Sequence, residues 1–259
     1  MHAVSRTMEI LALLAEAPRG LTFPAIIERL RMEKSAASRI LTTLETDGYV
    51  TRDPSSNVIR LGLKYIGITL RYLDGINLEE IWAPILRDLA QAAGELVQLA
   101  AVESERIVYI AKVESSQRIR VASLLGKEAV RHVTTAGRVW LASLPPELAI
   151  QIALKDNELV SPAHRISVEE LKADLSEVRR NGYATVHGKL LQGLSAIGVP
   201  IHVRSSVVGA VVVVGPSFRM SAERLRDLAP ALKVASTQLS AVWPPALLMA
   251  GMERAVSVA

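Results

Sequence analysis

The segment from residue 20 to residue 61 constrains the fold more than any other part of the chain, because two helical patterns there are separated by a very short turn. Thr22 can cap the first helix, and Pro24 falls in its first turn, where the missing amide proton of proline costs nothing. The apolar side chains of this helix recur at helical spacing, at Ile26, Ile27 and Leu30. The turn that follows is expected at Arg31, Met32 and Glu33.

The second helix of the pair is predicted from about Lys34 to Thr46. Its apolar residues share one face, which consists of Ala37, Ile40, Leu41 and Leu44. The residues on or near the opposite face are small, polar or cationic: Lys34, Ser35, Ala36, Ser38 and Arg39. Such a face suits the major groove of DNA.

Two short strands are expected after the second helix. Gly48 ends that helix, and residues 49–52 and 58–61 alternate like paired strands around the loop 53–57. A further helix is expected near the N-terminus, with Ser5 as its candidate cap. Three helices and a hairpin in this order predict a winged helix-turn-helix, so DNA is the leading partner.

The composition fits an ordinary globular protein. The chain has 259 residues, half of them hydrophobic, which is enough for two compact domains. It has no cysteine, which excludes disulfides, thiolate nucleophiles and cysteine zinc fingers and fits the cytoplasm. A formal charge of +4 would not by itself argue for nucleic acid. The apolar run VVGAVVVVG has about half of the roughly 20 residues that a membrane span needs, so it predicts a buried strand and no membrane partner.

The chain is expected to divide into four parts. A winged helix-turn-helix domain covers residues 1–63, a linker helix 64–77, a second domain 78–245 and a C-terminal tail 246–259. The apolar residues of the linker helix lie on more than one face, which indicates that this helix packs on a partner.

The second domain is predicted to be α+β. Its strands are expected near 97–102, 107–113, 119–124, 193–203 and 207–215. Its helices are expected near 81–93, at 135–144, after Pro146, from Ser167 to before Gly182, and from Ser221 to about Trp243. Short successive strands imply an antiparallel sheet, with helices flanking it.

No arrangement of residues in the sequence points to catalysis. The five histidines, at positions 2, 132, 164, 187 and 202, show no HExxH pattern and no two-histidine helical spacing, so neither a metal nor a cofactor is expected. Ser195 lies in GLSAIG, which lacks the spacing of a nucleophile elbow. Glu103 and Glu105 fit a solvated hairpin better than an acid/base pair. His132 and His187 remain candidate donors in a pocket, and the chain is not expected to be an enzyme.

Several stretches in the correct order resemble the IclR family of bacterial transcription regulators. They are SRTMEILALLAEAPRGLT, EKSAASRILTTLETDGYV, IRLGLKYIGI, RHVTTAGRVWLASLP, NGYATVHGKLLQGLSAIGVPI and VVGAVVVVGPSFRM. The resemblance covers nearly the whole chain. It implies a winged-helix DNA-binding domain, a linker helix and a GAF-like effector-binding domain, assembled as dimers or dimers of dimers.

The resemblance also places an effector pocket in the second domain. Its expected lining is Leu124, Ala129, Thr134, Thr135, Ala136, Val186, Ala196, Val212 and Val214. Where the family often has serines near its last signature strand, this chain has Val212 and Val214, and Ala196 replaces a polar or sulfur side chain of some members. The pocket is therefore expected to be more apolar than usual, which favours an acid with an apolar or aromatic body.

The candidate DNA contacts are Thr22, Lys34, Ser35, Ala36, Ser38, Arg39, Ser56, Asn57 and Arg60. Arg39 is the leading candidate because Arg is the commonest guanine reader, although it could instead bind phosphate or pair with Glu45. Thr22 could be only a cap, and the loop residues could form only a solvated turn. Arg31 and Ala36 depart from the glycine and threonine common in the family, which leaves the base preference open.

These features predict a ligand-responsive regulator of a catabolic operon that binds a palindromic operator and responds to a small organic acid. Whether the ligand releases or recruits DNA binding stays open. One alternative is an architectural DNA-binding protein whose second domain only oligomerises, which the modest charge disfavours. The other is an enzyme with an appended winged helix, for which the catalytic residues are missing.

Overall fold

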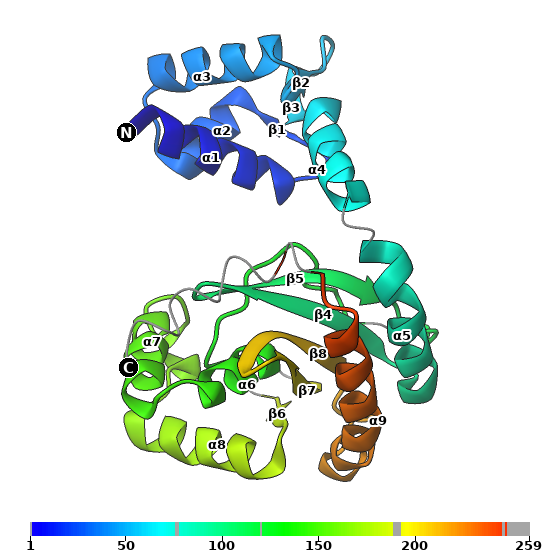
Figure 1. The fold of residues 1–259 in the computed structure, drawn as a ribbon. Helices are drawn as coiled ribbons and strands as arrows, with labels where there is room; N and C mark the ends of the chain where they lie inside the picture. The colour runs from blue at the N-terminus through cyan, green and yellow to red at the C-terminus, as the bar shows by residue number, and fades with distance from the viewer. Residues whose placement is uncertain (1, 76–77, 120, 189–192, 245–246, 248–259) are drawn as a thin grey trace. The chain divides into compact units, whose positions relative to one another are not determined.

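The fold is given by a computed structural model, which describes residues 2–75, 78–119, 121–188, 193–244 and 247. The chain forms two compact units, Met1–Ile76 and Asn77–Ala259 (Figure 1). The predicted tail, 246–259, lies outside the described residues except for Leu247, and so do the last two residues of the predicted linker.

The first unit contains four helices and a small antiparallel sheet with the strand order β1-β3-β2 among its described residues. Its elements are α1 (His2–Ala15), β1 (Leu21–Thr22), α2 (Phe23–Leu30), α3 (Lys34–Thr46), β2 (Val50–Arg52), β3 (Val58–Leu61) and α4 (Leu63–Gly75). The predicted order of helices and hairpin is therefore confirmed. The short strand β1 was not predicted, because two residues are too few to show an alternating pattern.

One core holds the first unit together. Ile10 of α1, Ile26 of α2, Leu41 of α3 and Ile59 of β3 are each at most 1% exposed and pack in a single cluster. The prediction that Ser5 caps α1 was wrong. The helix begins at His2, because no residue from 2 to 4 breaks a helix, and Ser5 lies inside it.

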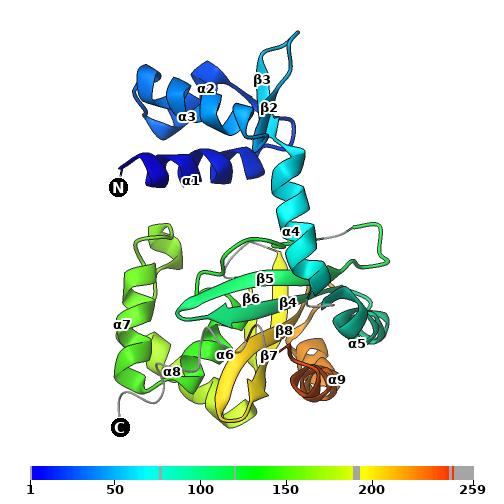
Figure 2. The same cartoon turned by 45° about the horizontal axis from the view of Figure 1, so that its top comes forward.

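The second unit is a five-stranded antiparallel sheet with helices on both faces, which confirms the α+β class (Figure 2). Its elements are α5 (Leu78–Ala93), β4 (Leu96–Glu103), β5 (Arg106–Val113), α6 (Thr135–Ser143), α7 (Pro146–Asp156), a 3-10 turn (Pro162–His164), α8 (Val168–Asn181), β6 (Ala184–His187), β7 (Leu194–Val203), β8 (Ser206–Pro216) and α9 (Ala222–Ala241). The strand order is β5-β4-β8-β7-β6.

The apolar valine run forms β8 at the centre of this sheet. Val211 and Val213 point to the face covered by α5 and α9, and Val212 points to the face covered by α6. All three are at most 2% exposed. Both faces of the central strand are therefore buried, which explains why its sequence does not alternate. No helix in the described part of the chain is long and apolar enough to cross a membrane.

In the stretch 119–124 predicted as a strand, the described residues 119 and 121–124 are not in a strand. Side chains from other parts of the chain form hydrogen bonds with backbone groups of this segment. These are groups that a neighbouring strand would otherwise bind. Arg219 Nη2 donates to the carbonyl of Ile119 at 3.0 Å, and the amide of Leu124 donates to Gln98 Oε1 at 2.7 Å. The segment is thereby held near the sheet without belonging to it.

Two glycines let the N-terminus of α6 approach its surroundings closely. A Cβ atom on Gly198 of β7 would lie 2.8 Å from Thr135 Oγ1, and one on Gly137 would lie 2.1 Å from the carbonyl oxygen of Arg131. Both distances are too short for any larger residue. The start of α6 is therefore fixed directly above the sheet.

Candidate DNA-binding surface and ligand pocket

The helix α3 exposes the face that the sequence assigned to DNA. Lys34, Ser35, Ser38 and Arg39 are exposed and Ala36 is half-buried. The opposite face buries Ala37, Leu41 and Leu44, while Ile40, which was expected to be buried, is only half-buried. The helix is thus anchored by one face and free to contact a partner with the other.

Arg39 does not form the ion pair with Glu45 that the sequence left open. Arg52 Nε lies 3.4 Å from Glu45 Oε2 instead. In the part of the chain that the structure describes, no ion pair is found for Arg39. Its guanidinium is therefore available to an acceptor outside the protein.

Two of the candidate hydroxyls differ in their availability. Ser35 Oγ donates to Glu33 Oε1 at 2.5 Å, next to the start of α3. Thr22 occupies the cap position of α2, but its side chain makes no capping hydrogen bond. The hydroxyl of Thr22 is exposed, whereas that of Ser35 would have to leave Glu33 to reach DNA.

The loop between β2 and β3, the wing, is organised by Asp53. Asp53 Oδ1 accepts the amides of Ser55 and Ser56, each at 2.9 Å, and the Ser55 hydroxyl at 2.6 Å. These hydrogen bonds, led by the Ser55 hydroxyl, hold the pKa of Asp53 well below its usual value. Ser56 and Asn57 are left exposed at the tip, with Asn57 at a φ of 55°.

Arg60 has a partner within the protein. Its Nε donates to the carbonyl of Arg19 at 3.2 Å, which ties β3 to the turn before β1. Gly20 lies in that turn at a φ of 81°, and a Cβ there would lie 2.6 Å from the carbonyl of Ile59. Arg60 therefore supports the hairpin as well as carrying a charge on it.

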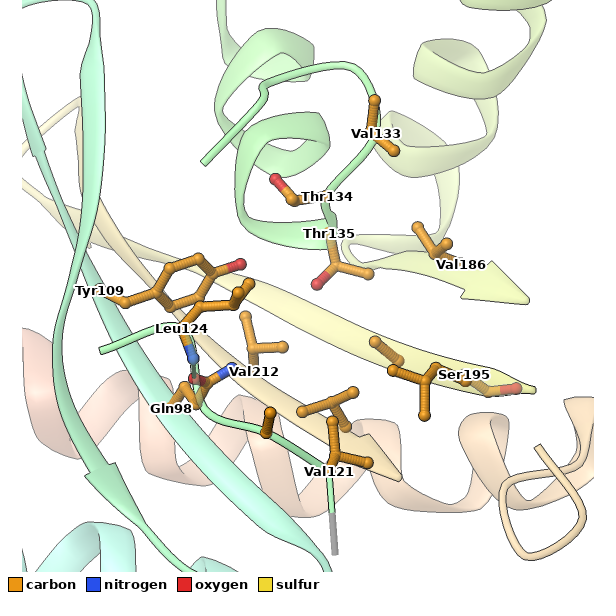
Figure 3. Close-up of a pocket in the computed structure, with 14 residues that line it drawn as sticks. Gln98, Tyr109, Val121, Leu124, Val133, Thr134, Thr135, Val186, Ser195 and Val212 are labelled. Carbon is orange, nitrogen blue, oxygen red and sulfur yellow. Dashed lines mark hydrogen bonds between the residues drawn. The ribbon is translucent and has the colours of Figure 1, made fainter. Parts of the chain in front are cut away.

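The second unit contains an apolar cavity between the sheet, the N-terminus of α6 and the segment 121–124 (Figure 3). Its empty volume is about 580 Å³ including the open mouth. The residues that line it are Gln98, Tyr109, Val121, Ala122, Leu124, Val133, Thr134, Thr135, Val186, Leu194, Ser195, Ala196, Val212 and Val214. Neither His132 nor His187 is among them.

The N-terminus of α6 contributes the polar end of the cavity. Thr134 caps the helix, and its Oγ1 accepts the amide of Gly137 at 3.1 Å. Within the described residues, the amides of Thr135 and Ala136 have no acceptor. Free amides at a helix start, with the positive end of the helix dipole, favour an anion.

Tyr109 forms part of the same wall. It is 2% exposed, and its hydroxyl is hydrogen-bonded to the side chain of Thr134. Burial raises the pKa of Tyr109 to about 12. The phenol therefore stays neutral at all physiological pH values and cannot repel an anionic ligand.

A second, polar hollow lies between α6, α8 and β6. Arg138 Nη1 of α6 lies 3.0 Å from Asp174 Oδ2 of α8, and Arg138 Nε donates to the carbonyl of His132 at 2.8 Å. The first contact joins α6 to α8, and the second joins α6 to the segment that precedes it. No group of His, Asp and Glu that could hold a metal ion is found in residues 2–75, 78–119, 121–188 and 193–244.

Ser195 has a histidine neighbour but not the surroundings of a nucleophile. Its Oγ lies 2.7 Å from His187 Nδ1 and donates to Ser217 Oγ at 2.8 Å. Ser195 is 1% exposed, and the described residues provide no third group that orients His187. A nucleophilic serine needs its base oriented in this way, so the contact is best explained as a structural link between β6 and β7.

The family models match both units. The IclR helix-turn-helix domain matches residues 3–54, and the domain described as bacterial transcriptional regulator IclR C-terminal matches residues 70–241. The chain belongs to the IclR family. The resemblance drawn from the sequence is therefore confirmed, and the first unit is the DNA-binding domain of a transcriptional regulator.

Individual relatives agree with this assignment. The HTH-type transcriptional regulator KdgR of Escherichia coli (strain K12) is 31% identical over 244 residues, which cover 93% of this chain and 92% of the relative. An IclR transcriptional regulator from Alicyclobacillus acidocaldarius is similar in structure, with a TM-score of 0.80 and 26% identity over 93% of this chain and 98% of the other. An IclR homologue from Microbacterium hydrocarbonoxydans, crystallised with 4-hydroxybenzoate, has the same fold, with a TM-score of 0.77 and 21% identity over 93% and 98% of the two chains.

The expected effector residues of this IclR protein divide into two groups. Seven of them surround the cavity: Leu124, Thr134, Thr135, Val186, Ala196, Val212 and Val214. Ala129 and Ala136 lie instead in the hydrophobic core and do not line it. Ala136 is on the first turn of α6, but its side chain is not part of the cavity lining, so only its backbone amide remains relevant.

Seven lining residues were not predicted: Gln98, Tyr109, Val121, Ala122, Val133, Leu194 and Ser195. Gln98 gave a signal that could have been used, because it is a polar residue in the middle of the apolar strand LVQLAAV. Val121 and Ala122 gave none, since they were assigned to a strand that does not form.

Proposed function

We propose that this IclR-type regulator binds a palindromic DNA operator as a dimer or dimer of dimers and controls a catabolic operon in response to a small organic acid. The observation that carries the proposal is an apolar cavity beside the start of α6, where two backbone amides have no acceptor among the described residues, in a chain whose helix α3 also exposes a polar and cationic face. Binding to an operator implies that the protein acts in the cytoplasm.

The exposed face of α3 supports direct reading of the major groove. Lys34 and Arg39 supply cationic groups near the N-terminal half of the helix, and Ser38 supplies a short polar side chain between them. Recognition helices contact bases with this half. Thr22 and the tip of the wing, at Ser56 and Asn57, would then contact the DNA backbone, with Arg60 beside them.

The cavity supports an acid whose carboxylate lies at the start of α6. The amides of Thr135 and Ala136 would donate to it, and the Thr135 hydroxyl lies at the same end (Figure 3). Most of the remaining wall is apolar, at Leu124, Val186, Leu194, Val212 and Val214. Such a wall favours an acid with an aromatic or branched apolar body over a small polar one.

The helix α4 supports self-association. Within the described residues none of its side chains is buried, even though many of them are apolar. Four of these apolar side chains are between 41% and 59% exposed: Ile66, Ile68, Leu70 and Tyr72. An apolar helix surface of this kind usually marks an interface. Two copies would double the DNA contact and require inverted half-sites.

The proposal is tested with the purified full-length protein and DNA from upstream of its own gene, at fixed salt. Footprinting should show inverted half-sites about one helical turn apart, or a multiple of it, and one member of a panel of aromatic and aliphatic acids should change the affinity. The acid can act only if it binds two conformations of the protein unequally. Absence of sequence preference at every salt concentration would refute the operator, and no effect of any acid would refute the effector class.

A further inference from the structure

Gln98 is a polar side chain within the apolar run LVQLAAV of strand β4. It is 2% exposed and lines the cavity, where it lies opposite Val212 of β8. Burying a primary amide on the wall of an apolar cavity is unfavourable unless its donors and acceptors are used. The cost of burying this amide therefore depends on which of its donors and acceptors have partners within the protein.

The oxygen of the Gln98 amide is fully used inside the protein. Gln98 Oε1 accepts the backbone amide of Leu124 at 2.7 Å and the hydroxyl of Ser123 at 3.0 Å. Because a backbone amide only donates, the group facing Leu124 must be the oxygen, which fixes the orientation of the side chain. The nitrogen, Nε2, consequently points toward the cavity (Figure 3).

The nitrogen has no acceptor among the residues that the structure describes. Two other polar side chains of the lining are paired within the protein: the hydroxyl of Tyr109 is bonded to Thr134, and that of Ser195 to His187 and Ser217. At the sheet side of the cavity, Gln98 Nε2 is thus a donor held in a fixed place and directed at the contents of the pocket.

We propose that Gln98 determines ligand specificity by donating to a hydrogen-bond acceptor on the effector, such as a carbonyl or ether oxygen, separate from the carboxylate. This inference rests on the proposed binding of an acid in the cavity. It identifies the effector as an acid with a second acceptor group, because an analogue without that group leaves the donor of Gln98 buried and unpaired.

The inference is tested with matched pairs of probes on the full-length protein. The 2-, 3- and 4-acetylbenzoates carry a carbonyl acceptor, and the corresponding isopropylbenzoates have a similar shape without one. Isothermal titration gives the affinity ratio of acetyl to isopropyl compound for each position. The ratio cancels effects that are common to both acids.

Two variants separate the donor from the rest of the side chain. Gln98→Met is similar in size and has no donor and only a weakly accepting sulfur, whereas Gln98→Glu, when ionised, keeps an oxygen for Leu124 and Ser123 but has no donor. For at least one position of the acetyl group, both variants should lower the affinity ratio by about 2- to 12-fold, the range of a single neutral hydrogen bond. Circular dichroism checks that each variant is folded.

Ser123→Ala is the matched control, since it removes a hydrogen bond to Gln98 Oε1 and leaves the donor in place. Its affinity ratio should equal that of the wild type. Ratios unchanged in both Gln98 variants, with the acids still bound, would overturn the role of Gln98 while leaving the acid pocket intact. Failure of all six acids to bind the wild type would overturn the acid pocket itself, and the inference with it.

Discussion

Arg31 occupies the left-handed backbone region that is unfavourable for most residues. It ends α2 at a φ of 48° and ψ of 48°, at the turn where the IclR family commonly has glycine. The amide of Arg31 donates to the carbonyl of Glu28 at 3.3 Å, so the conformation is needed to close the helix. The turn therefore requires the left-handed conformation, and this conformation is strained because the residue in it has a side chain.

Arg31→Gly should stabilise the first unit by about 1 kcal/mol, because glycine adopts this conformation without a Cβ penalty. Hydrogen exchange followed by mass spectrometry should show slower exchange of the amides in α2 and α3. Arg31→Ala removes the same charge but keeps the strain, and it should leave the exchange rates unchanged. Equal protection in both variants would show that charge, and not backbone strain, controls this turn.

His132 is buried in a position that disfavours its charged form. It is 1% exposed, its Nε2 lies 3.1 Å from the carbonyl oxygen of His164, and its Nδ1 has no partner within the described residues. Burial is the largest effect and lowers its pKa from the ordinary value of 6.5. Unfolding therefore allows His132 to take up a proton that the folded state resists.

The sign of the pH dependence follows from this lowered pKa. Above pH 6.5 His132 is neutral in both states and costs nothing, and as the pH falls below 6.5 the unfolded state gains a proton first, so stability decreases. The urea midpoint followed by tryptophan fluorescence should fall between pH 7.5 and pH 5.5, and the fall should be smaller in His132→Gln. The control is His202→Gln, at an exposed position, which should leave the full pH dependence of the urea midpoint. Identical curves for the wild type and both variants would contradict the assignment of this pH dependence to His132.

At the scale of elements, the N-terminal turns of α3 and α6 present different kinds of chemical groups. The first turns of α3 present side chains, whereas the first turn of α6 presents backbone amides. This difference follows from what each helix packs against. α3 buries only one face, and α6 buries every residue from Thr135 to Leu141 between the sheet and α8.

Arg39→Ala should weaken binding to the specific operator by tenfold or more, if its guanidinium reads a base edge, since a good bidentate contact contributes about 1–3 kcal/mol. Binding to unrelated DNA should fall much less. Fluorescence anisotropy at two salt concentrations separates the two effects. The control, Arg226→Ala, removes the same charge at an exposed position of α9 and should have little effect on DNA binding. If Arg39→Ala weakened binding to both kinds of DNA equally, Arg39 would instead contact a phosphate.

At the scale of the whole molecule, α4 leaves several large apolar side chains exposed within its own unit. Its apolar side chains lie on more than one face, and in the first unit they find no core to enter. A second copy would remove this surface from water, which is the main source of free energy in association. Self-association through α4 would therefore be driven by the same burial of apolar surface that drives folding.

Ile66→Asp should shift the protein toward monomers, because a carboxylate would be buried in the interface. Sedimentation velocity should show a lower average mass, and operator binding should weaken together with it. Val234→Asp, at an exposed apolar residue of α9, is the control and should leave the mass unchanged. An unchanged mass for Ile66→Asp would exclude α4 as the contact.

The local elements could be predicted because their causes are local. The bounds of α3 were predicted from helical spacing and Gly48, and the capping box of Ser167 and Glu170 marked the start of α8. The central strand followed from its valine run. Each of these signals lies within a few residues of the structure that it specifies, so the sequence by itself determined the winged helix-turn-helix and the α+β class.

The lining of the cavity was decided only by the tertiary structure. Residues 119–124 have a strand-like sequence pattern, but two residues distant in sequence bind backbone groups near the ends of this stretch: Arg219 binds the carbonyl of Ile119, and Gln98 binds the amide of Leu124. The position of Thr135 at the cavity likewise depends on Gly198 of β7, where any side chain would meet Thr135. Such choices depend on contacts between distant segments, and those contacts exist only once the chain is folded.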